Sequence, residues 1–281
     1  MDNLTLKAHA KLNLTFDILG KMENGFHKIE SVMHEISLHD VVELRELKGD
    51  KIKLICNIKQ LENEKNIVFK SAKLLKEKFN VKKGVEIKID KNIPVGGGLG
   101  GGSSDAACVL KGLNRLWGLN LSNLVIINLA AEIGTDVPFF INGGTAFAFN
   151  KGEMIEKVEF GKKLNFIIIN KGIKVDTKYA YSIVDVSKTG EMKATQKMLE
   201  AIKSNKNISG LLHNDFEQII FPRYPEIEKA KEDLIKQGAD NALLTGSGAT
   251  VFGIFSDKGK IKNAFEILKK KYSFVYLSQS V

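Results

Sequence analysis

Residues 96–104 read Gly-Gly-Gly-Leu-Gly-Gly-Gly-Ser-Ser, and Leu99 carries the one bulky side chain of this run. Ordering a glycine costs more backbone entropy than ordering any other residue, so such a run is expected where the backbone itself has a role. The usual role is to bring main-chain N–H groups against a large anion, with a helix N-terminus behind them. The segment from Asp105 to Leu116 is predicted to be that helix. We therefore expect a cradle for the phosphates of a nucleotide.

The run differs from the better-known glycine-rich phosphate loops. A Walker-type loop ends in Gly-Lys-Ser or Gly-Lys-Thr, whereas this one continues Ser103-Ser104-Asp105 without a lysine. The spacing Gly96-x-Gly98-x-x-Gly101 matches a dinucleotide fingerprint, but in a run of glycines that match is nearly automatic. The acidic residue expected about 20 positions later to bind a ribose is missing from residues 117–121.

The two serines at the start of the predicted helix favour a triphosphate. Successive N–H groups can surround the β and γ phosphates, and the hydroxyls of Ser103 and Ser104 can bind phosphate oxygens or a metal ion. The helix dipole adds about half a positive charge. A flexible linker is the alternative, but linkers seldom lead directly from Ile93-Pro94 into an amphipathic helix. We therefore expect residues 94–104 to form a phosphate loop.

The organisation of the chain indicates two domains. Its 281 residues exceed the usual length of one domain, and 43% of them are apolar. Hairpin strands with helices between them indicate an α+β fold rather than a regularly alternating parallel sheet. We place the domains at residues 1–155 and 156–281. The net charge is +9, but the lysines are scattered, and the sequence has no basic, aromatic cluster typical of an RNA-binding domain.

Apolar periodicity predicts the individual elements. Alternation from Leu12 to Ile18 predicts a strand, with Lys11 and Asn13 together on its polar, non-core face. Asn24-Gly25 marks a turn. Further strands are expected at residues 41–44, 52–58, 85–89, 139–149 (around Gly143-Gly144), 164–169, 249–255 and 274–277. Helices are expected after an Asn66 cap and at residues 105–116, 121–133, 178–184, 191–203, 224–237 and 259–272.

The cysteines and the hydropathy indicate a cytoplasmic protein. Cys56 and Cys108 lack a metal-type spacing and are expected to be buried, small apolar residues in a reducing compartment. No run approaches the ~18 apolar residues needed to cross a bilayer. The first residues lack the apolar core and cleavage site of a signal peptide. We expect no membrane partner.

Residues 94–107, Pro-Val-Gly-Gly-Gly-Leu-Gly-Gly-Gly-Ser-Ser-Asp-Ala-Ala, resemble the phosphate loop of the GHMP kinases. This family is named for galactose, homoserine, mevalonate and phosphomevalonate substrates. Further motifs resemble one branch of it, whose acceptor is a cytidine-diphosphate-linked methylerythritol. In this sequence they are residues 10–14 (Ala-Lys-Leu-Asn-Leu), 24–27 (Asn-Gly-Phe-His), 112–117 (Gly-Leu-Asn-Arg-Leu-Trp), 134–140 (Gly-Thr-Asp-Val-Pro-Phe-Phe) and 244–249 (Leu-Thr-Gly-Ser-Gly-Ala).

The resemblance implies a two-domain GHMP-kinase fold with an active-site cleft between the domains. It implies ATP-dependent phosphorylation of the 2-hydroxyl of the acceptor, giving the 2-phosphate and ADP in non-mevalonate isoprenoid precursor biosynthesis. ATP and Mg²⁺ would be the cofactors, no nucleic acid would bind, and the chain would be a monomer or a homodimer. The alternatives are a homoserine or mevalonate kinase of the same family, or a non-catalytic ligand sensor on the same scaffold.

By the same resemblance, Asp136 is the candidate catalytic base and Lys11 is its partner. A nearby ammonium would favour the charged form of the aspartate and stabilise charge that develops on the alcohol and the phosphoryl group. Without the resemblance, Asp136 would be interpreted as a turn or capping residue and Lys11 as a solvated lysine. Asn13, two residues further along the same strand face, could orient the acceptor.

The resemblance also implies recognition of a cytosine. A flat base is bound by aromatic stacking and by hydrogen bonds at its edge. Phe26 and Tyr181 are the stacking candidates, His27 is the candidate at the base edge, and Thr177 is expected to line the same pocket. Tyr179 competes with Tyr181 for the stacking role.

The ATP site implied by the resemblance consists of the loop and one residue outside it. Its members are Pro94, Val95, Gly96, Gly97, Gly98, Leu99, Gly100, Gly101, Gly102, Ser103, Ser104 and Asn66. Residues 245–248, a second glycine-rich turn, face the active site in the family, but a purely structural turn is an equal alternative for any single residue there. The sequence identifies no metal ligands.

Overall fold

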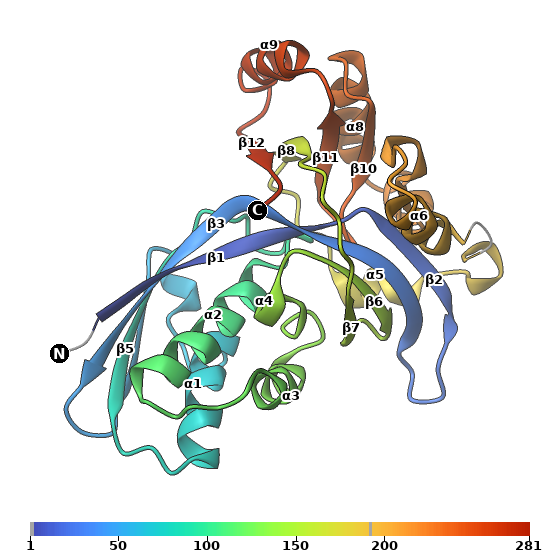
Figure 1. Cartoon of the computed structure of the whole chain (residues 1–281). Helices are drawn as coiled ribbons and strands as arrows, with labels where there is room; N and C mark the ends of the chain where they lie inside the picture. Colours follow the sequence, from blue (N-terminus) through green and yellow to red (C-terminus); the bar gives the residue numbers. More distant parts are fainter. Residues whose placement is uncertain (1–2, 191–192) are drawn as a thin grey trace. The chain divides into compact units, whose positions relative to one another are not determined.

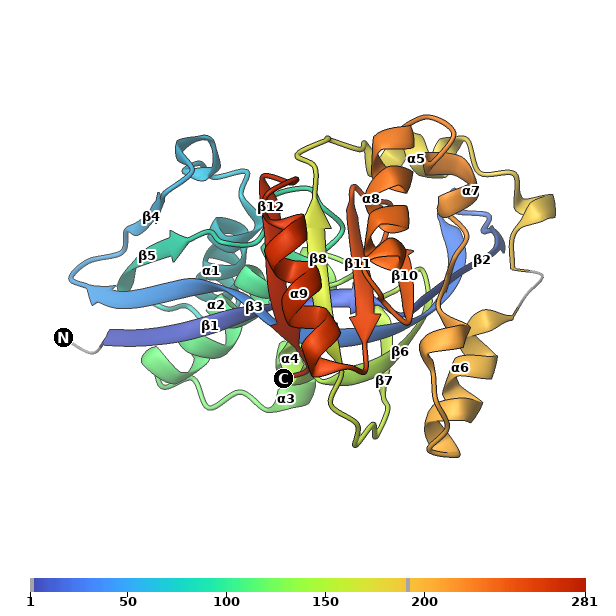
Figure 2. The same ribbon diagram turned by 90° about the horizontal axis from the view of Figure 1, so that it is seen from above.

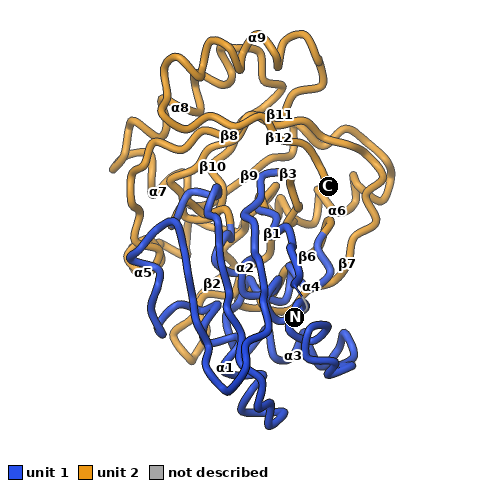
Figure 3. Tube along the Cα trace, turned by 90° about the vertical axis from the view of Figure 1, so that its left-hand side faces the viewer, with its two compact units in different colours: residues 1–10, 38–95, 100–143 blue, residues 11–37, 96–99, 144–281 orange. Residues whose placement is uncertain are grey.

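The computed structural model describes residues 3–190 and 193–281, which form two compact units (Figure 1, Figure 3). Unit 1 comprises residues 1–10, 38–95 and 100–143, and unit 2 comprises residues 11–37, 96–99 and 144–281. Each unit is thus assembled from segments far apart in the sequence. The domain boundary after residue 155 stays a prediction.

The sheet of unit 1 is built from strands that alternate as the sequence predicts. It contains the first part of β1 (Asn3–Asn13), the second part of β3 (His27–Leu47), β4 (Ile52–Cys56) and β5 (Gly84–Asp90). Strand β5 is antiparallel to β3 and parallel to β4. Val85, Ile87 and Ile89 of β5 are buried, which confirms the period-two prediction for this strand.

Helices cover one face of this sheet (Figure 1). They are α1 (Ile67–Lys78), α2 (Gly101–Leu116), α3 (Asn123–Ile133) and the short α4 (Phe139–Asn142), and a 3₁₀ turn, η1 (Lys59–Leu61), precedes α1. Helix α2 packs against α1, α3 and α4. A Cβ at Gly112 would lie 2.4 Å from the Leu44 Cδ1 atom of β3, so this glycine lets α2 lie directly on the sheet.

Two predictions between residues 101 and 149 are wrong. Helix α2 begins at Gly101, four residues before the predicted start, so the second half of the glycine run is already helical. Residues 139–149 do not form a strand throughout, because Phe139–Asn142 is helical and the strand begins only at Thr145, after Gly143-Gly144. Apolar periodicity could not distinguish a helix from a strand at residues 139–142, because a short apolar run suits a buried helix turn as well as a buried strand.

Unit 2 contains an antiparallel sheet in the order β10-β11-β8-β12. Its strands are β8 (Asn165–Asn170), β10 (Asn241–Leu244), β11 (Thr250–Phe255) and β12 (Phe274–Gln279). Helices α8 (Pro225–Lys236) and α9 (Lys258–Leu268) cover one face of this sheet (Figure 2). The core includes Ile167, Ile169, Val251 and Leu234, which are fully buried.

The rest of unit 2 is arranged around the first part of β3. This part pairs with β2 (Thr15–Lys21) and with β6 (Thr145–Asn150), which in turn pairs with β7 (Met154–Lys157). Strand β9 (His213–Asn214) runs parallel to β2. The remaining elements are α5 (Thr177–Ser182), η2 (Val186–Lys188), α6 (Ala194–Lys203), η3 (Ser209–Leu211) and α7 (Glu217–Ile220).

The predicted strand from Leu12 to Ile18 is interrupted at Leu14, where β1 ends and β2 begins. Its polar face is also not a solvent face, because Lys11 is 3% exposed and Asn13 is fully buried. The predicted helix 191–203 begins at Ala194, and its first two positions lie outside the described residues. Among the described residues, no helix is both long enough and apolar enough to span a membrane.

Candidate active site

The carbonyl groups in the middle of the glycine loop are turned into the protein. The Gly97 carbonyl accepts from Thr250 N–H (3.3 Å) and the Leu99 carbonyl accepts from Lys11 N–H (3.0 Å). The Gly98 carbonyl receives a weaker contact from the Thr245 hydroxyl at 3.5 Å. The carbonyl groups of residues 97–99 thus find donors within unit 2, to which these residues belong, and most of the loop N–H groups remain for another partner.

Among the described residues, the amides of Gly96 and of residues 98–103 have no acceptor, whereas the Gly97 N–H closes a turn that begins at Pro94. Gly100 is the N-cap of α2, with φ +69° and no side-chain cap, so the first N–H groups of the helix also lack one. Ser103 is half-buried and Ser104 is buried on the first turn. A group of free amides that leads into a helix N-terminus is the arrangement that binds phosphates.

The second glycine-rich turn packs directly against this loop. A Cβ at Gly98 would lie 2.2 Å from the Thr245 carbonyl oxygen, and one at Gly246 would lie 3.4 Å from the Gly98 Cα. Ser247 in the same turn shares a hydrogen bond with Thr177 (2.8 Å). The turn therefore supports the loop, a contact that the sequence alone left open.

Lys11 and Asn13 form a buried polar network. Lys11 Nζ donates to Asn13 Oδ1 at 2.5 Å, and Asn13 Nδ2 donates to Ser31 Oγ at 2.7 Å. The Asn13 N–H donates to Thr245 Oγ1 at 3.0 Å. Asn13 is thus hydrogen-bonded to Lys11, Ser31 and Thr245. Its predicted contact with an acceptor substrate stays a prediction.

Asp136 lies half-buried in the turn between α3 and α4. Helix α3 ends at Ile133, as predicted, with Gly134 as its C-cap, and Val137 N–H donates to the Gly134 carbonyl (3.2 Å) to close the turn. Asp136 belongs to unit 1 and Lys11 to unit 2. Their pairing as base and partner stays a prediction.

Two of the candidates for base recognition, His27 and Tyr181, lie in contact in unit 2. The His27 and Tyr181 rings stack, with centroids 5.1 Å apart and planes at 25°, and Phe216 meets the Tyr181 ring edge-on at 4.9 Å. Burial, with a smaller contribution from Lys21, lowers the pKa of His27 below its ordinary value. A neutral imidazole has both a donor and an acceptor nitrogen, which suits the edge of a base.

The other aromatic candidates lie elsewhere on unit 2. Phe26 is 54% exposed at the β2–β3 turn, and the Lys151 ammonium lies 5.4 Å from its ring centroid. The Tyr179 ring contacts the Arg223 guanidinium, which lies 5.1 Å from its centroid, whereas the His27 ring stacks on Tyr181. Geometry therefore favours Tyr181 over Tyr179 beside His27. Lys151 was not identified from the sequence, because a lysine in an Asn-Lys-Gly turn carries no distinguishing signal.

Asn66 has the capping role that the sequence predicts. Its side chain accepts from Val68 N–H at 2.9 Å and donates to the Leu61 carbonyl at 2.9 Å. These contacts fix the start of α1 in unit 1. A contact between Asn66 and adenine stays a prediction.

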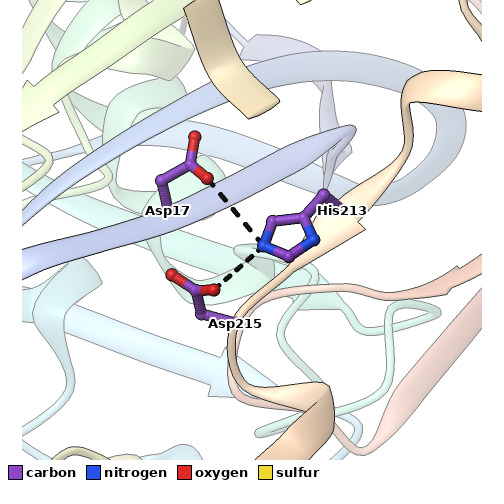
Figure 4. A group of neighbouring side chains, drawn as sticks. All are labelled: Asp17, His213 and Asp215. Atoms are coloured by element: carbon purple, nitrogen blue, oxygen red, sulfur yellow. Dashed lines mark hydrogen bonds and ion pairs between the residues drawn. The ribbon is translucent and has the colours of Figure 1, made fainter. Parts of the chain in front are cut away.

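Asp17, His213 and Asp215 form a cluster with the composition of a metal site (Figure 4). His213 Nε2 lies 2.9 Å from Asp215 Oδ1 and 3.9 Å from Asp17 Oδ1. The other contacts of the two carboxylates are with backbone N–H groups, those of Ile18, Gly190, Ala194 and Thr195. These donors already satisfy the carboxylate oxygens. The cluster therefore has a structural role, because its hydrogen bonds connect β2, β9 and the start of α6.

The comparisons with known proteins identify one family of kinases. Residues 66–144 match the family model of the GHMP kinases N terminal domain, and residues 196–273 match that of the GHMP kinases C terminal domain. A 4-diphosphocytidyl-2-C-methyl-D-erythritol kinase of Thermoanaerobacter pseudethanolicus is 38% identical, over 100% of this chain and 97% of that protein.

Two solved structures are similar in fold. The crystal structure of a 4-(cytidine 5'-diphospho)-2C-methyl-D-erythritol kinase has a TM-score of 0.85 and 26% identity, over 99% of this chain and 100% of that chain. A homoserine kinase from Cytophaga hutchinsonii has a TM-score of 0.76 and 19% identity, over 100% of this chain and 95% of that chain. At 19% identity, the similarity to the homoserine kinase is one of fold alone.

The α+β fold, the glycine-rich loop and both family models define an ATP-dependent small-molecule kinase of the GHMP class. These matches confirm the predicted fold class and the predicted kinase activity. Within that class the chain belongs to the family of the 4-diphosphocytidyl-2-C-methyl-D-erythritol kinases.

Proposed function

We propose that this chain transfers the γ-phosphoryl group of ATP to the 2-hydroxyl of 4-diphosphocytidyl-2-C-methyl-D-erythritol. The products are the 2-phosphate and ADP, and the reaction belongs to the non-mevalonate route to isoprenoid precursors. The observation that carries the proposal is the loop at residues 96–103, most of whose amides are free while three of its carbonyls are turned into the protein. Family membership supplies the acceptor.

In the proposed reaction, the loop amides and the N-terminus of α2 bind the triphosphate and fix the γ-phosphoryl group in line with the acceptor hydroxyl. The hydroxyls of Ser103 and Ser104 are oxygen donors of the kind that Mg²⁺ accepts beside phosphates and water. The ion would neutralise charge on the phosphates. Lys11, oriented by Asn13, stabilises the developing negative charge, and Asp136 accepts the hydroxyl proton.

The cytidine end of the substrate is proposed to bind at the aromatic group of unit 2. His27 and Tyr181 already lie in contact, and Thr177 is fixed close by through Ser247. Phe26, exposed at the neighbouring turn, offers a second aromatic surface. Homoserine and mevalonate have no base, so an enzyme specific for either would gain nothing from these rings.

The first test is an ADP-release assay with the cytidine substrate, homoserine and mevalonate in parallel. We expect turnover with the cytidine substrate alone.

Replacement of the base, Asp136→Asn, is expected to lower kcat by about 10²–10⁴-fold while ATP still binds. Lys11→Met is expected to have a similar effect. Normal kcat in either variant would remove that residue from the mechanism.

The second test separates the two tyrosines. Tyr181→Ala is expected to raise KM for the cytidine substrate by about ten-fold or more, since aromatic–base stacking contributes about 1–3 kcal/mol. Tyr179→Ala is the matched control, because it removes the same side chain from the same helix and is expected to leave that KM unchanged. The reverse result would assign the stacking role to Tyr179.

A further inference from the structure

A buried charge cluster lies at both ends of the glycine loop. Asp40 of β3, Lys91 at the end of β5 and Asp105 of α2 all belong to unit 1. Their side chains are at most 4% exposed. Lys91 lies three residues before Pro94, and Asp105 directly follows Ser104. The cluster is therefore attached to the chain immediately before and immediately after residues 94–104.

Asp40 fixes the chain where it enters the loop. Its Oδ1 accepts the N–H groups of Asn92 (2.6 Å) and Ile93 (2.8 Å). Its Oδ2 accepts from Lys91 Nζ. Three consecutive residues are thus held by one carboxylate, because a buried carboxylate is stable only when its oxygens accept hydrogen bonds.

Lys91 joins this entry segment to the helix that follows the loop. Its Nζ also donates to Asp105 Oδ2 at 2.7 Å, in the second turn of α2. The two loop ends touch at the same place, since a Cβ at Gly101 would lie 2.9 Å from Ile93 Cγ2 and 3.2 Å from Lys91 Nζ. Residues 94–100 therefore form a closed loop whose base is the Asp40–Lys91–Asp105 cluster.

We infer that Lys91 is a positioning residue for ATP binding: its ammonium, shared by Asp40 and Asp105, holds the two ends of the glycine loop together so that the loop amides converge. The inference rests on the proposed function of that loop. Lys91 acts through the backbone and is not itself required to touch ATP.

The charge balance explains why the ammonium is needed. Two buried carboxylates share one cation, and Asp105 Oδ1 has no hydrogen-bond partner among the described residues. Burial raises the pKa of Asp105 to about 7, although Lys91 opposes the shift. Burial alone would lower the pKa of Lys91, but Asp105 and Asp40 raise it overall. Without Lys91, the loop ends would lose the ammonium that bridges Asp40 and Asp105.

The test measures ATP affinity by titration calorimetry, with ATP and Mg²⁺ as the probe, together with KM for ATP and for the acceptor. Lys91→Met is expected to weaken ATP binding by about ten-fold or more, because small displacements of a binding site are costly, and to leave the acceptor KM nearly unchanged. Lys91→Arg, which keeps the charge and can bind both carboxylates, is expected to recover most of the affinity.

A second variant tests the inference independently in case Lys91→Met does not fold. Asp105→Ala cuts the link to α2 but leaves a balanced Asp40–Lys91 pair, and we expect the same selective loss of ATP affinity. Lys76→Met is the matched control in unit 1. Its ammonium binds the carbonyls of Val81 and Lys83 at the far end of α1, so its loss is expected to lower stability without changing the ATP affinity.

The outcomes separate the inference from the proposed function. ATP affinity that is unchanged in both Lys91→Met and Asp105→Ala, in a chain whose wild type binds ATP, would overturn the inference alone. An equal loss in Lys76→Met would also overturn it, since the effect would then be one of general stability. A wild-type chain that binds no ATP would overturn the proposed function and this inference with it.

Discussion

Individual residues of the glycine loop are constrained to different degrees. Gly96 and Gly98 both have positive φ, +72° and +80°. Nothing lies within 4 Å of a Cβ at Gly96, whereas a Cβ at Gly98 would be 2.2 Å from the Thr245 carbonyl oxygen. The first glycine is therefore required by the backbone conformation alone, and the second also by a close approach of two chain segments.

This difference predicts the effect of two matched substitutions. Gly96→Ala is expected to lower the free energy of unfolding by about 1–2 kcal/mol, the cost of a left-handed alanine. Gly98→Ala adds a backbone clash and is expected to cost at least about 2 kcal/mol more. Urea unfolding of the two variants would check this. Equal losses would show that the loop can move away from Thr245 at little cost.

At the scale of elements, two helices start by different means. Helix α1 is capped by its own preceding residue, Asn66. Helix α6 is preceded by Lys193 in the left-handed conformation, which provides no side-chain cap. Its first amides donate instead to Asp17 of β2, from Ala194 N (3.3 Å) and Thr195 N (2.7 Å). The cap of α6 thus comes from a strand 177 residues away in the chain.

Removal of these caps is expected to have unequal effects. Asn66→Ala should lower the free energy of unfolding by about 1 kcal/mol, as for an ordinary N-cap. Asp17→Ala should cost about 2–4 kcal/mol, because it leaves buried N–H groups without an acceptor and removes a charge from beside His213. Chemical denaturation of both variants gives the comparison. A smaller loss for Asp17→Ala would mean that water replaces the carboxylate.

At the scale of the whole molecule, buried histidines make stability depend on pH. His34 of β3 shares hydrogen bonds with Thr145 of β6 and Ser280 near the C-terminus, each at 2.8 Å. Burial, with a smaller contribution from Lys163, lowers the pKa of His34 to about 4. The unfolded chain therefore binds a proton near pH 6.5 that the folded chain binds only near pH 4.

Stability is accordingly expected to fall as the pH drops from about 6.5 to about 4, by up to about 3 kcal/mol for this one group. His34→Gln keeps polar atoms at the site without a titrating ring, so its unfolding free energy should change less over this window. Unfolding curves at several pH values measure the difference. Parallel curves for the variant and the wild type would contradict the assignment to His34.

The pKa of His213 is shifted upward, in the opposite direction to that of His34. Its hydrogen bond to Asp215 raises its pKa, burial opposes the shift, and the charges of Asp215 and Asp17 raise it further. The stabilisation that His213 contributes is therefore complete below about pH 6.5 and is lost as the pH rises through its folded pKa. His213→Gln is expected to remove that loss on the alkaline side, in the same unfolding series.

Much of the local structure could be predicted because its causes are local. The Asn66 cap, the end of α3 at Gly134 and the alternation of β5 depend on residues within a few positions of each other. The early start of α2 was missed because glycine disfavours a helix interior, and only packing of α2 against its neighbours stabilises the added turn. Helix α4 was missed because short apolar runs have no diagnostic period.

The candidate site could be proposed from the sequence as a set of residue types, but its geometry could not. The glycine run and the motifs around Lys11, His27 and Asp136 led to the family, and the matched relatives agree. The burial of Lys11 and Asn13 could not be inferred, because alternation identifies two strand faces without saying whether the polar one is also covered.

The sequence alone determined the class of the fold, predicted a phosphate loop and located most of the longer helices approximately. These follow from the conformational freedom of glycine, side-chain caps and apolar spacing, all of which act over short stretches of chain. Only the tertiary structure decided which distant groups satisfy the buried polar atoms. Asn13 binds Thr245, 232 residues away, and His34 binds Ser280, 246 residues away, because a buried group must find a partner in whichever segment packs beside it.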